Sequence, residues 1–165
     1  MTQSREQTPA QPLTELVYSS DTPEPMTPEA VKALLEHARE KNTRMQVTGL
    51  LCYDGRRFLQ IIEGESDTIL DLFHEIQNDP RHTNVHILHD GEVERRAFSD
   101  WKMAYEPVPS GMLPSLGRSI ARASLDAALR GETDLGTSAG QRIFSLFMDE
   151  LYGGDEAPPR RPVPA

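Results

Sequence analysis

Apolar and polar positions alternate along the chain in a way that predicts a strand, a helix, two strands, a second helix and two final strands. The strand segments are residues 13–19, 46–53, 57–63, 84–95 and 100–105. Each is rich in apolar or β-branched residues and is bounded by residues that favour turns. Asp54-Gly55, between the second and third strands, is a strong signal for a two-residue hairpin.

Two segments carry apolar residues at helical spacing. The first begins at Thr27-Pro28-Glu29, which combines a hydroxyl N-cap, a proline at the first helical position and an acid in the first turn. It is expected to end near Asn42, and the second helix is expected to stop before Pro80. The two apolar stripes are Val31, Leu34, Leu35 and Ala38 in the first helix, and Ile69, Leu72, Phe73 and Ile76 in the second.

This order of elements predicts an α+β fold, a ferredoxin-like βαββαββ sandwich in which one strand is added to the usual four. The strand at residues 58–62 is apolar on both sides, so both sheet faces should be covered. A Pro- and Gly-rich stretch at 107–114 breaks the pattern, and helices are expected at 115–130 and 139–152. This helical pair would cover the second sheet face or meet a partner.

The predicted organisation has four parts. Residues 1–12 form a disordered N-terminal tail, residues 13–106 the folded domain, residues 107–152 a helical C-terminal extension and residues 153–165 a disordered Pro-rich tail.

Charge and composition exclude several functions. The 165 residues carry a formal net charge of −9, whereas a nucleic-acid-binding protein needs a basic surface. No stretch approaches the ~18 apolar residues of a membrane span, and the N-terminus lacks the features of a signal peptide. Cys52 is the only cysteine and cannot form an internal disulfide, which fits a cytoplasmic location.

Gln60 is the polar residue that fits its strand least well, because Phe58 and Ile62 flank it on the same face. A buried amide without partners costs roughly 1–3 kcal/mol, so it requires nearby hydrogen-bonding groups. Tyr18 on the first strand and Asn42 at the end of the first helix are two such groups. Taken separately, the three residues also fit an exposed strand glutamine, an amphipathic tyrosine and a helix C-cap. If they converge, they suit a planar, neutral ligand.

Five segments, in order and at consistent spacing, resemble the signature blocks of BLUF domains, which are blue-light sensors that use FAD. They are LVYSS at 16–20, Asn42 followed by QVTGLL at 46–51, FLQIIEG at 58–64, DPRH at 79–82 and RAFSDWKM at 96–103. The resemblance implies that FAD, with FMN as the alternative, is held non-covalently between the first two helices.

The resemblance also implies roles for individual residues. Tyr18 and Gln60 match the photoactive pair, and Asn42 matches the asparagine that holds the edge of the isoalloxazine. Further residues that match flavin-site positions are Asp79, Arg81 and His82 near the end of the second helix, and Trp101 and Met103 on the last strand. Which of Trp101 and Met103 lies next to the flavin stays open. Lys41 occupies a position where relatives often have His or Asn in contact with flavin.

The family mechanism would make Tyr18 the electron donor and pass its proton through Gln60, whose amide would end rotated or tautomerised. The resemblance implies a sensor, not an enzyme, that signals to a separate effector or regulator protein, with a homodimer as a further option. Two alternatives stay open, a flavin-dependent oxidoreductase and a flavin-free interaction module of the same fold. A metal site at His82, His86 and His89 is disfavoured, because four strand residues separate the first two by roughly 13 Å.

Overall fold

The computed structural model describes residues 11–115, 117, 118, 122 and 129. Its elements follow the predicted order of strand, helix, two strands, helix and two strands. They are β1 (Leu13–Asp21), α1 (Pro28–Met45), β2 (Thr48–Tyr53), β3 (Arg57–Glu65), α2 (Ser66–Asn78), β4 (Thr83–Glu92) and β5 (Ala104–Pro107).

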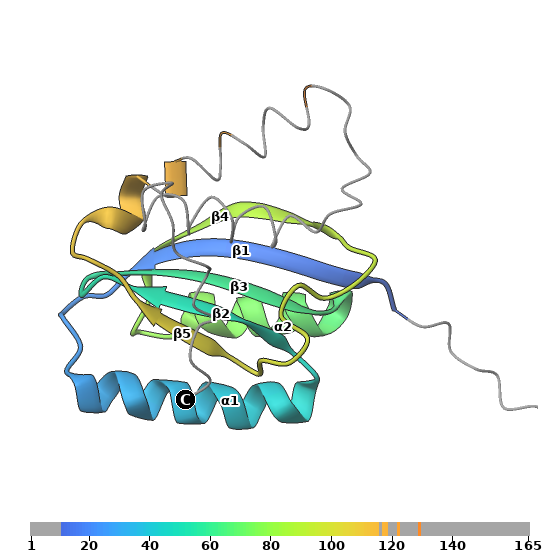
Figure 1. Ribbon diagram of the computed structural model, residues 1–165, viewed down its shortest axis with the longest axis horizontal. Coiled ribbons are helices and arrows are strands. Elements are labelled where there is room, and N and C mark those ends of the chain that lie inside the picture. The colour runs from blue at the N-terminus through green and yellow to red at the C-terminus, as the bar shows by residue number, and fades with distance from the viewer. Residues whose placement is uncertain (1–10, 116, 119–121, 123–128, 130–165) are drawn as a thin grey trace, which may run out of the picture.

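The strands form one five-stranded sheet in the order β4-β1-β3-β2-β5 (Figure 1). The first four strands are antiparallel neighbours, and this order is that of a ferredoxin-like sandwich. β5 is the added strand, which pairs in parallel with β2 at the edge of the sheet. The predicted fold of the domain is therefore confirmed.

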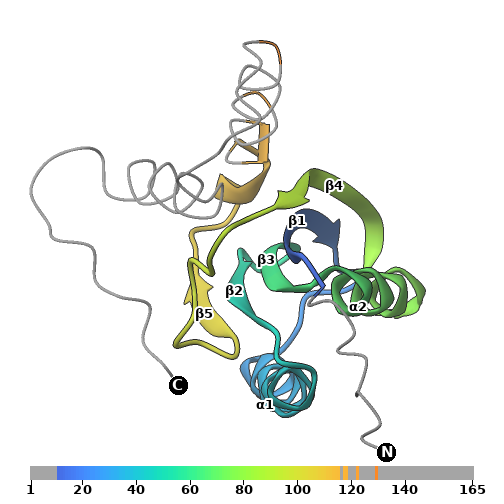
Figure 2. The same cartoon turned by 90° about the vertical axis from the view of Figure 1, so that its right-hand side faces the viewer.

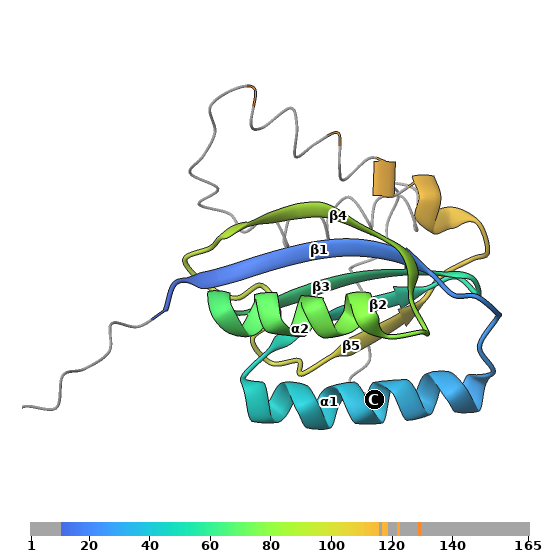
Figure 3. The same cartoon turned by 180° about the vertical axis from the view of Figure 1, so that it is seen from behind.

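Both helices cover the same face of the sheet, called here the helix face (Figure 2). Their buried residues pack with those strand residues that point to this side, and α2 lies over the strands when the molecule is seen from behind (Figure 3). The resulting core includes Leu16, Tyr18, Val31, Leu35, Leu51, Phe58, Ile62, Ile69, Phe73 and Met103. The two apolar helix stripes predicted from the sequence thus form this core.

The opposite face, called here the far face, is covered by chain that follows β4. Its core consists of Val17, Leu50, Cys52, Leu59, Ile61, Phe98, Ala104, Val108 and Leu113, with Trp101 packed against them. The sequence predicted a last strand at 100–105, but the structure begins it at Ala104. Trp101 packs on the far face and Met103 on the helix face, whereas residues two apart in a regular strand share a face. The chain therefore turns before β5 begins.

Local chemistry sets the ends of α1. Thr27 is its N-cap, and the Thr27 side chain accepts a 3.1 Å hydrogen bond from the Ala30 amide, as predicted. The helix runs to Met45, three residues beyond the expected end, and stops where Gln46 takes a left-handed conformation with φ 54°. The Val47 amide then donates to the Asn42 carbonyl, which turns the chain into β2.

The β2–β3 hairpin is stabilised by Asp54. Its carboxylate accepts hydrogen bonds from the backbone amides of Arg56 and Arg57, and the Asp54 amide donates to the Arg57 carbonyl. Gly55 has φ +95°, a conformation in which a Cβ would be strained. The predicted hairpin is present, and Gly55 and Arg56 lie at its tip.

The predicted C-terminal helices and both predicted tails lie almost wholly outside the described residues. Within the described part, residues 112–115 are helical, and Leu113 is buried against the far face.

Candidate functional site

Tyr18 and Gln60 are direct partners in the β1–β3 ladder, and both side chains lie on the helix face. Tyr18 is 0% exposed and Gln60 is 8% exposed. The Tyr18 hydroxyl donates a hydrogen bond to the Gln60 side-chain oxygen Oε1. Backbone pairing therefore brings together the two residues that the sequence marked as a photoactive pair.

The other end of the Gln60 amide is also engaged. Its Nε2 group donates to the Met103 sulfur at 3.4 Å, within the range for a sulfur acceptor. The amide thus has its oxygen toward the phenol of Tyr18 and its nitrogen toward Met103. Tyr18 and Met103 are both buried. The amide oxygen therefore faces a hydrogen-bond donor, and the amide nitrogen faces an acceptor.

The last turns of α1 hold the backbone that leads into β5. The Asn42 amide donates to the Lys102 carbonyl at 2.7 Å, and Arg39 Nε donates to the Met103 carbonyl at 2.9 Å. Asn42 is buried, and Arg39 has a second nitrogen, Nη2, that is buried and lacks a hydrogen-bond partner among the described residues. Asn42 thus holds the residue that precedes Met103, the partner of Gln60.

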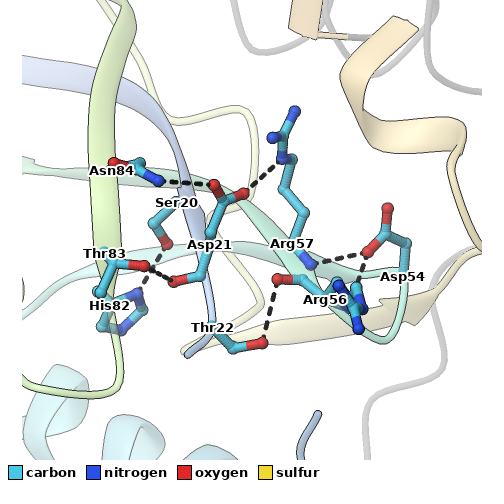
Figure 4. Close-up of polar contacts among 9 residues, drawn as sticks. All are labelled: Ser20, Asp21, Thr22, Asp54, Arg56, Arg57, His82, Thr83 and Asn84. Carbon is cyan, nitrogen blue, oxygen red and sulfur yellow. Dashed lines mark hydrogen bonds and ion pairs between the residues drawn. The ribbon is translucent and has the colours of Figure 1, made fainter. Parts of the chain in front are cut away.

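His82 lies on the other side of Tyr18. Its Nδ1 atom is 2.8 Å from the Ser20 hydroxyl, and its ring meets the Tyr18 ring edge-on with 6.2 Å between centroids. Figure 4 shows His82 and Ser20 beside a polar group in which Asp21 binds Arg57 and Asn84. Burial of the imidazole lowers the pKa of His82, which favours its neutral form.

Two ion pairs lie near the end of α2. Lys41 on α1 pairs with Glu75 on α2, so a cation and an acid link the two helices. Asp79 and Arg81 form a second pair, with 2.6 Å between Arg81 Nη2 and Asp79 Oδ2, and its hydrogen bonds lower the pKa of Asp79. Arg81 is exposed, so this pair lies at the edge of the site.

The environment of Tyr18 favours its protonated form. Burial raises the pKa of its hydroxyl, and the negative charge of Asp79 raises it further. Tyr18 is therefore a neutral hydrogen-bond donor throughout the physiological pH range.

The structure brings Met103, and not Trp101, to Gln60. Met103 is buried in the helix-face core, whereas Trp101 packs on Phe98 at the far face with 5.8 Å between ring centroids. The Gly49 amide donates to the Trp101 carbonyl, which fixes the backbone between the two side chains.

Two contributors were missed in the sequence. Arg39 on α1 and Ser20 on β1 contact Met103 and His82 respectively. Ser20 lies two residues after Tyr18 on the same strand face, so strand periodicity contained its signal. Arg39 lies three residues before Asn42, one helical turn away, and that spacing was the signal for it.

The described residues contain no group of three or more His, Cys, Asp or Glu placed to hold a metal ion. In the same ranges, no helix combines the length and hydropathy needed to cross a bilayer.

Known proteins resemble this chain over the domain that contains the site. The profile of the BLUF family, described as sensors of blue-light using FAD, matches residues 13–104. Photoactivated adenylate cyclase subunit beta of Euglena longa is 34% identical over 92 residues, which are 55% of this chain and 11% of that protein. The chain therefore spans about a tenth of the length of that relative.

Solved structures of BLUF proteins also align with this chain. The dark-state structure of the BLUF protein BlrB aligns with a TM-score of 0.58 at 28% identity and covers 82% of this chain and 98% of that one. Klebsiella pneumoniae BlrP1, solved with FMN and cyclic diGMP, aligns with a TM-score of 0.59 at 30% identity and covers 86% of this chain and 35% of that one. With its fold, its buried Tyr18–Gln60 pair and these similarities, the chain belongs to the BLUF family of flavin-binding blue-light sensors.

Proposed function

We propose that this sensor binds FAD non-covalently between α1 and α2 and that blue light rearranges the hydrogen bonds of Tyr18 and Gln60. The single observation that carries the proposal is the buried Tyr18–Gln60–Met103 chain of contacts. FAD is favoured over FMN by the description of the family, although the BlrP1 structure contains FMN.

The residues present fit a flavin. Tyr18, Asn42 and Gln60 are neutral, buried and able to donate or accept hydrogen bonds, which suits a planar ring with donors and acceptors along one edge. Arg39 adds a buried nitrogen without a partner among the described residues, and a ligand oxygen would satisfy it. Asn42, Gln60 and Arg39 would hold the ring edge, and Lys41 and His82 are further candidates for contact with the cofactor. Arg81 is exposed and Trp101 packs on the far face, so we assign these two weaker roles. Asp79 would act through its charge, which reaches Tyr18.

Bound flavin supplies a chromophore that becomes a strong oxidant when it absorbs blue light. Tyr18 would donate an electron to the excited flavin and lose its proton in the same step, because an oxidised phenol that kept its proton would be a buried charge. The Tyr18 hydroxyl already donates to Gln60 Oε1, so the amide is the proton's first acceptor. After both the electron and the proton return to Tyr18, a rotated or tautomerised amide presents a different set of donors and acceptors without a change in net charge.

The energy available for signalling is small. Each rearranged hydrogen bond contributes about 0.5–1.5 kcal/mol net, whereas a switch from 1:99 to 99:1 needs about 5.5 kcal/mol. The sensor therefore biases an element that already has two accessible arrangements. The backbone around Met103 is the first candidate, because Gln60 contacts it directly.

The output passes to a separate effector or regulator protein. Support comes from relatives in which the matched segment is a small part of a cyclase subunit, so the sensor and the output are distinct modules. We place the protein in the cytoplasm, because its only cysteine, Cys52, is buried and unpaired. Self-association as a homodimer is a second route for output, and sedimentation in light and in darkness would detect it.

A light-minus-dark absorption spectrum tests the proposal. The flavin-loaded protein is expected to show a small, reversible red shift, which Gln60→Leu abolishes while flavin stays bound. Gln77→Leu is the matched control, because Gln77 is an exposed glutamine on α2 and should leave the red shift intact. A normal photoresponse in Gln60→Leu would overturn the assigned mechanism, and failure to bind FAD or FMN would overturn the cofactor assignment.

A further inference from the structure

Glu63 is a buried carboxylate on the far face, three residues after Gln60 on β3. It is 0% exposed, and its two oxygens accept three hydrogen bonds. Oε1 accepts from the Ala97 amide at 2.6 Å, while Oε2 accepts from the Phe98 amide at 3.1 Å and from the Thr48 hydroxyl at 2.9 Å. The two backbone amides belong to the chain that leads from β4 to β5, so Glu63 attaches that chain to the sheet.

Arg96 strengthens the same attachment. Its Nη1 atom donates to the Thr48 hydroxyl and to the Glu63 carbonyl, each at 2.9 Å, and Nη2 donates to the Gln46 carbonyl at 2.6 Å. Residues 96–98 are therefore held at the end of the β2–β3 pair opposite the hairpin, where Thr48 pairs with Glu63. The hydrogen bonds from Arg96 are charge-assisted, which makes them about twice as strong as neutral ones.

The other end of this segment, residues 96–103, carries Met103 to Gln60. Between the ends, the Trp101 amide donates to the Phe98 carbonyl, and the Gly49 amide donates to the Trp101 carbonyl. The path from the Glu63 carboxylate to the Met103 sulfur thus runs through a short, hydrogen-bonded stretch of backbone.

We propose that Glu63 is a positioning residue for the photoreaction, because its carboxylate fixes the 96–103 segment that presents Met103 to Gln60. This inference rests on the proposed function. Met103 accepts from Gln60 Nε2, so it favours the amide orientation in which Oε1 faces Tyr18. A rotated amide would place Oε1 against the sulfur, where neither atom can donate. Glu63, acting through Met103, therefore favours the dark orientation and its recovery after illumination.

Glu63→Gln tests the inference, since the amide nitrogen that it introduces cannot accept a hydrogen bond from Ala97 or Phe98. In the flavin-loaded protein, the rate at which the red shift recovers in the dark should fall by about threefold or more. A change of this size is typical of coupling between residues of one hydrogen-bond network. Glu65→Gln is the matched control, because it removes the same charge from an exposed position on β3 and should recover at the normal rate.

A double-mutant cycle separates positioning from general destabilisation. In a Met103→Leu background, Glu63→Gln should no longer change the recovery rate, because the contact through which it acts is gone. In the dark, the ¹³C-methyl resonance of Met103 should shift in Glu63→Gln and stay in place in Glu65→Gln. An unmoved resonance, or an undiminished rate effect in the Met103→Leu background, would overturn the inference.

Thr48→Val gives a second route if Glu63→Gln does not fold. It keeps the size of the side chain and removes one hydrogen bond to Glu63 and one acceptor for Arg96. It should slow recovery in the same direction, and an unchanged rate would contradict the inference. Absence of any red shift in the unsubstituted protein would instead contradict the proposed function itself.

Discussion

Tyr18 and Gln60 occupy opposite positions on two adjacent antiparallel strands, and a hydrogen bond joins their side chains across the ladder. The register of the sheet, not a flexible loop, fixes the relation between phenol and amide. A slip of one residue would send one of them to the far face. The hydrophobic residues on both strands oppose such a slip, so the core of the fold maintains the geometry of the site.

Tyr18→Phe should remove the photoresponse and lower stability. The ring would keep its packing on Phe73, but Gln60 Oε1 would lose its donor inside the core. The free energy of unfolding should fall by about 1–3 kcal/mol, as measured by denaturant titration. The red shift should also disappear. Tyr105→Phe, on half-buried β5, is the control that should keep its photoresponse.

Stability should decrease as the pH falls below about 6.5, and His82 should contribute to that decrease. Burial lowers the pKa of His82 in the folded protein, so the unfolded chain binds the proton more readily. Protonation of His82 therefore favours unfolding. Its penalty on the free energy of unfolding is absent only at pH values above the pKa that His82 has in the unfolded chain. Between pH 7 and pH 5, the Tm of His82→Gln should fall less steeply with decreasing pH than the Tm of the unsubstituted protein. An identical slope in both proteins would contradict the assignment.

Lys41 should matter more for flavin retention than its ion-pair partner Glu75, because we propose that it also contacts the cofactor. The side chains of the pair are 24% and 55% exposed, so breaking the pair with Glu75→Gln should change the unfolding free energy by no more than about 1 kcal/mol. If Lys41 also contacts the cofactor, Lys41→Gln should release flavin faster than Glu75→Gln, as measured by the fluorescence of free flavin. Equal release rates would limit Lys41 to the ion pair.

Gly49→Ala should be strongly destabilising. A Cβ at Gly49 would lie 2.0 Å from the carbonyl oxygen of Ile61 on the neighbouring strand, and backbone cannot move aside cheaply. We expect a loss of about 2 kcal/mol or more in unfolding free energy, comparable to other overpacked core substitutions. Gly91→Ala on β4 is the control, because its new Cβ would have its nearest neighbour at 3.8 Å. Similar losses in both variants would refute the steric explanation.

The sequence predicted those parts of the fold that local pattern determines. The helical stripes, the Thr27 cap and the hairpin depend on neighbours within a few residues, and each is present. Gln60 could be identified because an amide among apolar residues needs partners, and Tyr18 is one of them.

The remainder depends on long-range contacts that periodicity does not contain. Trp101 and Met103 alternate as in a strand, but the chain turns between them, because the Glu63 carboxylate and the Gly49 amide hold residues 97–101 elsewhere. This course of the backbone decides that Met103, and not Trp101, accepts the hydrogen bond from Gln60 Nε2. The helical spacing places Arg39 on the same side of α1 as Asn42, but it does not reveal the carbonyl that Arg39 binds, because that carbonyl belongs to Met103, 64 residues away in the chain.

The shortness of β5 has a thermodynamic consequence. Four residues join it to the sheet along one side only, where it pairs with β2. Segments with few backbone hydrogen bonds at a sheet border open locally at a fraction of the free energy of global unfolding. Detachment of this strand therefore costs only a fraction of global unfolding. The hydrogen bonds that the Gln60 amide exchanges are of a comparable energy, so their rearrangement can change how often the strand detaches.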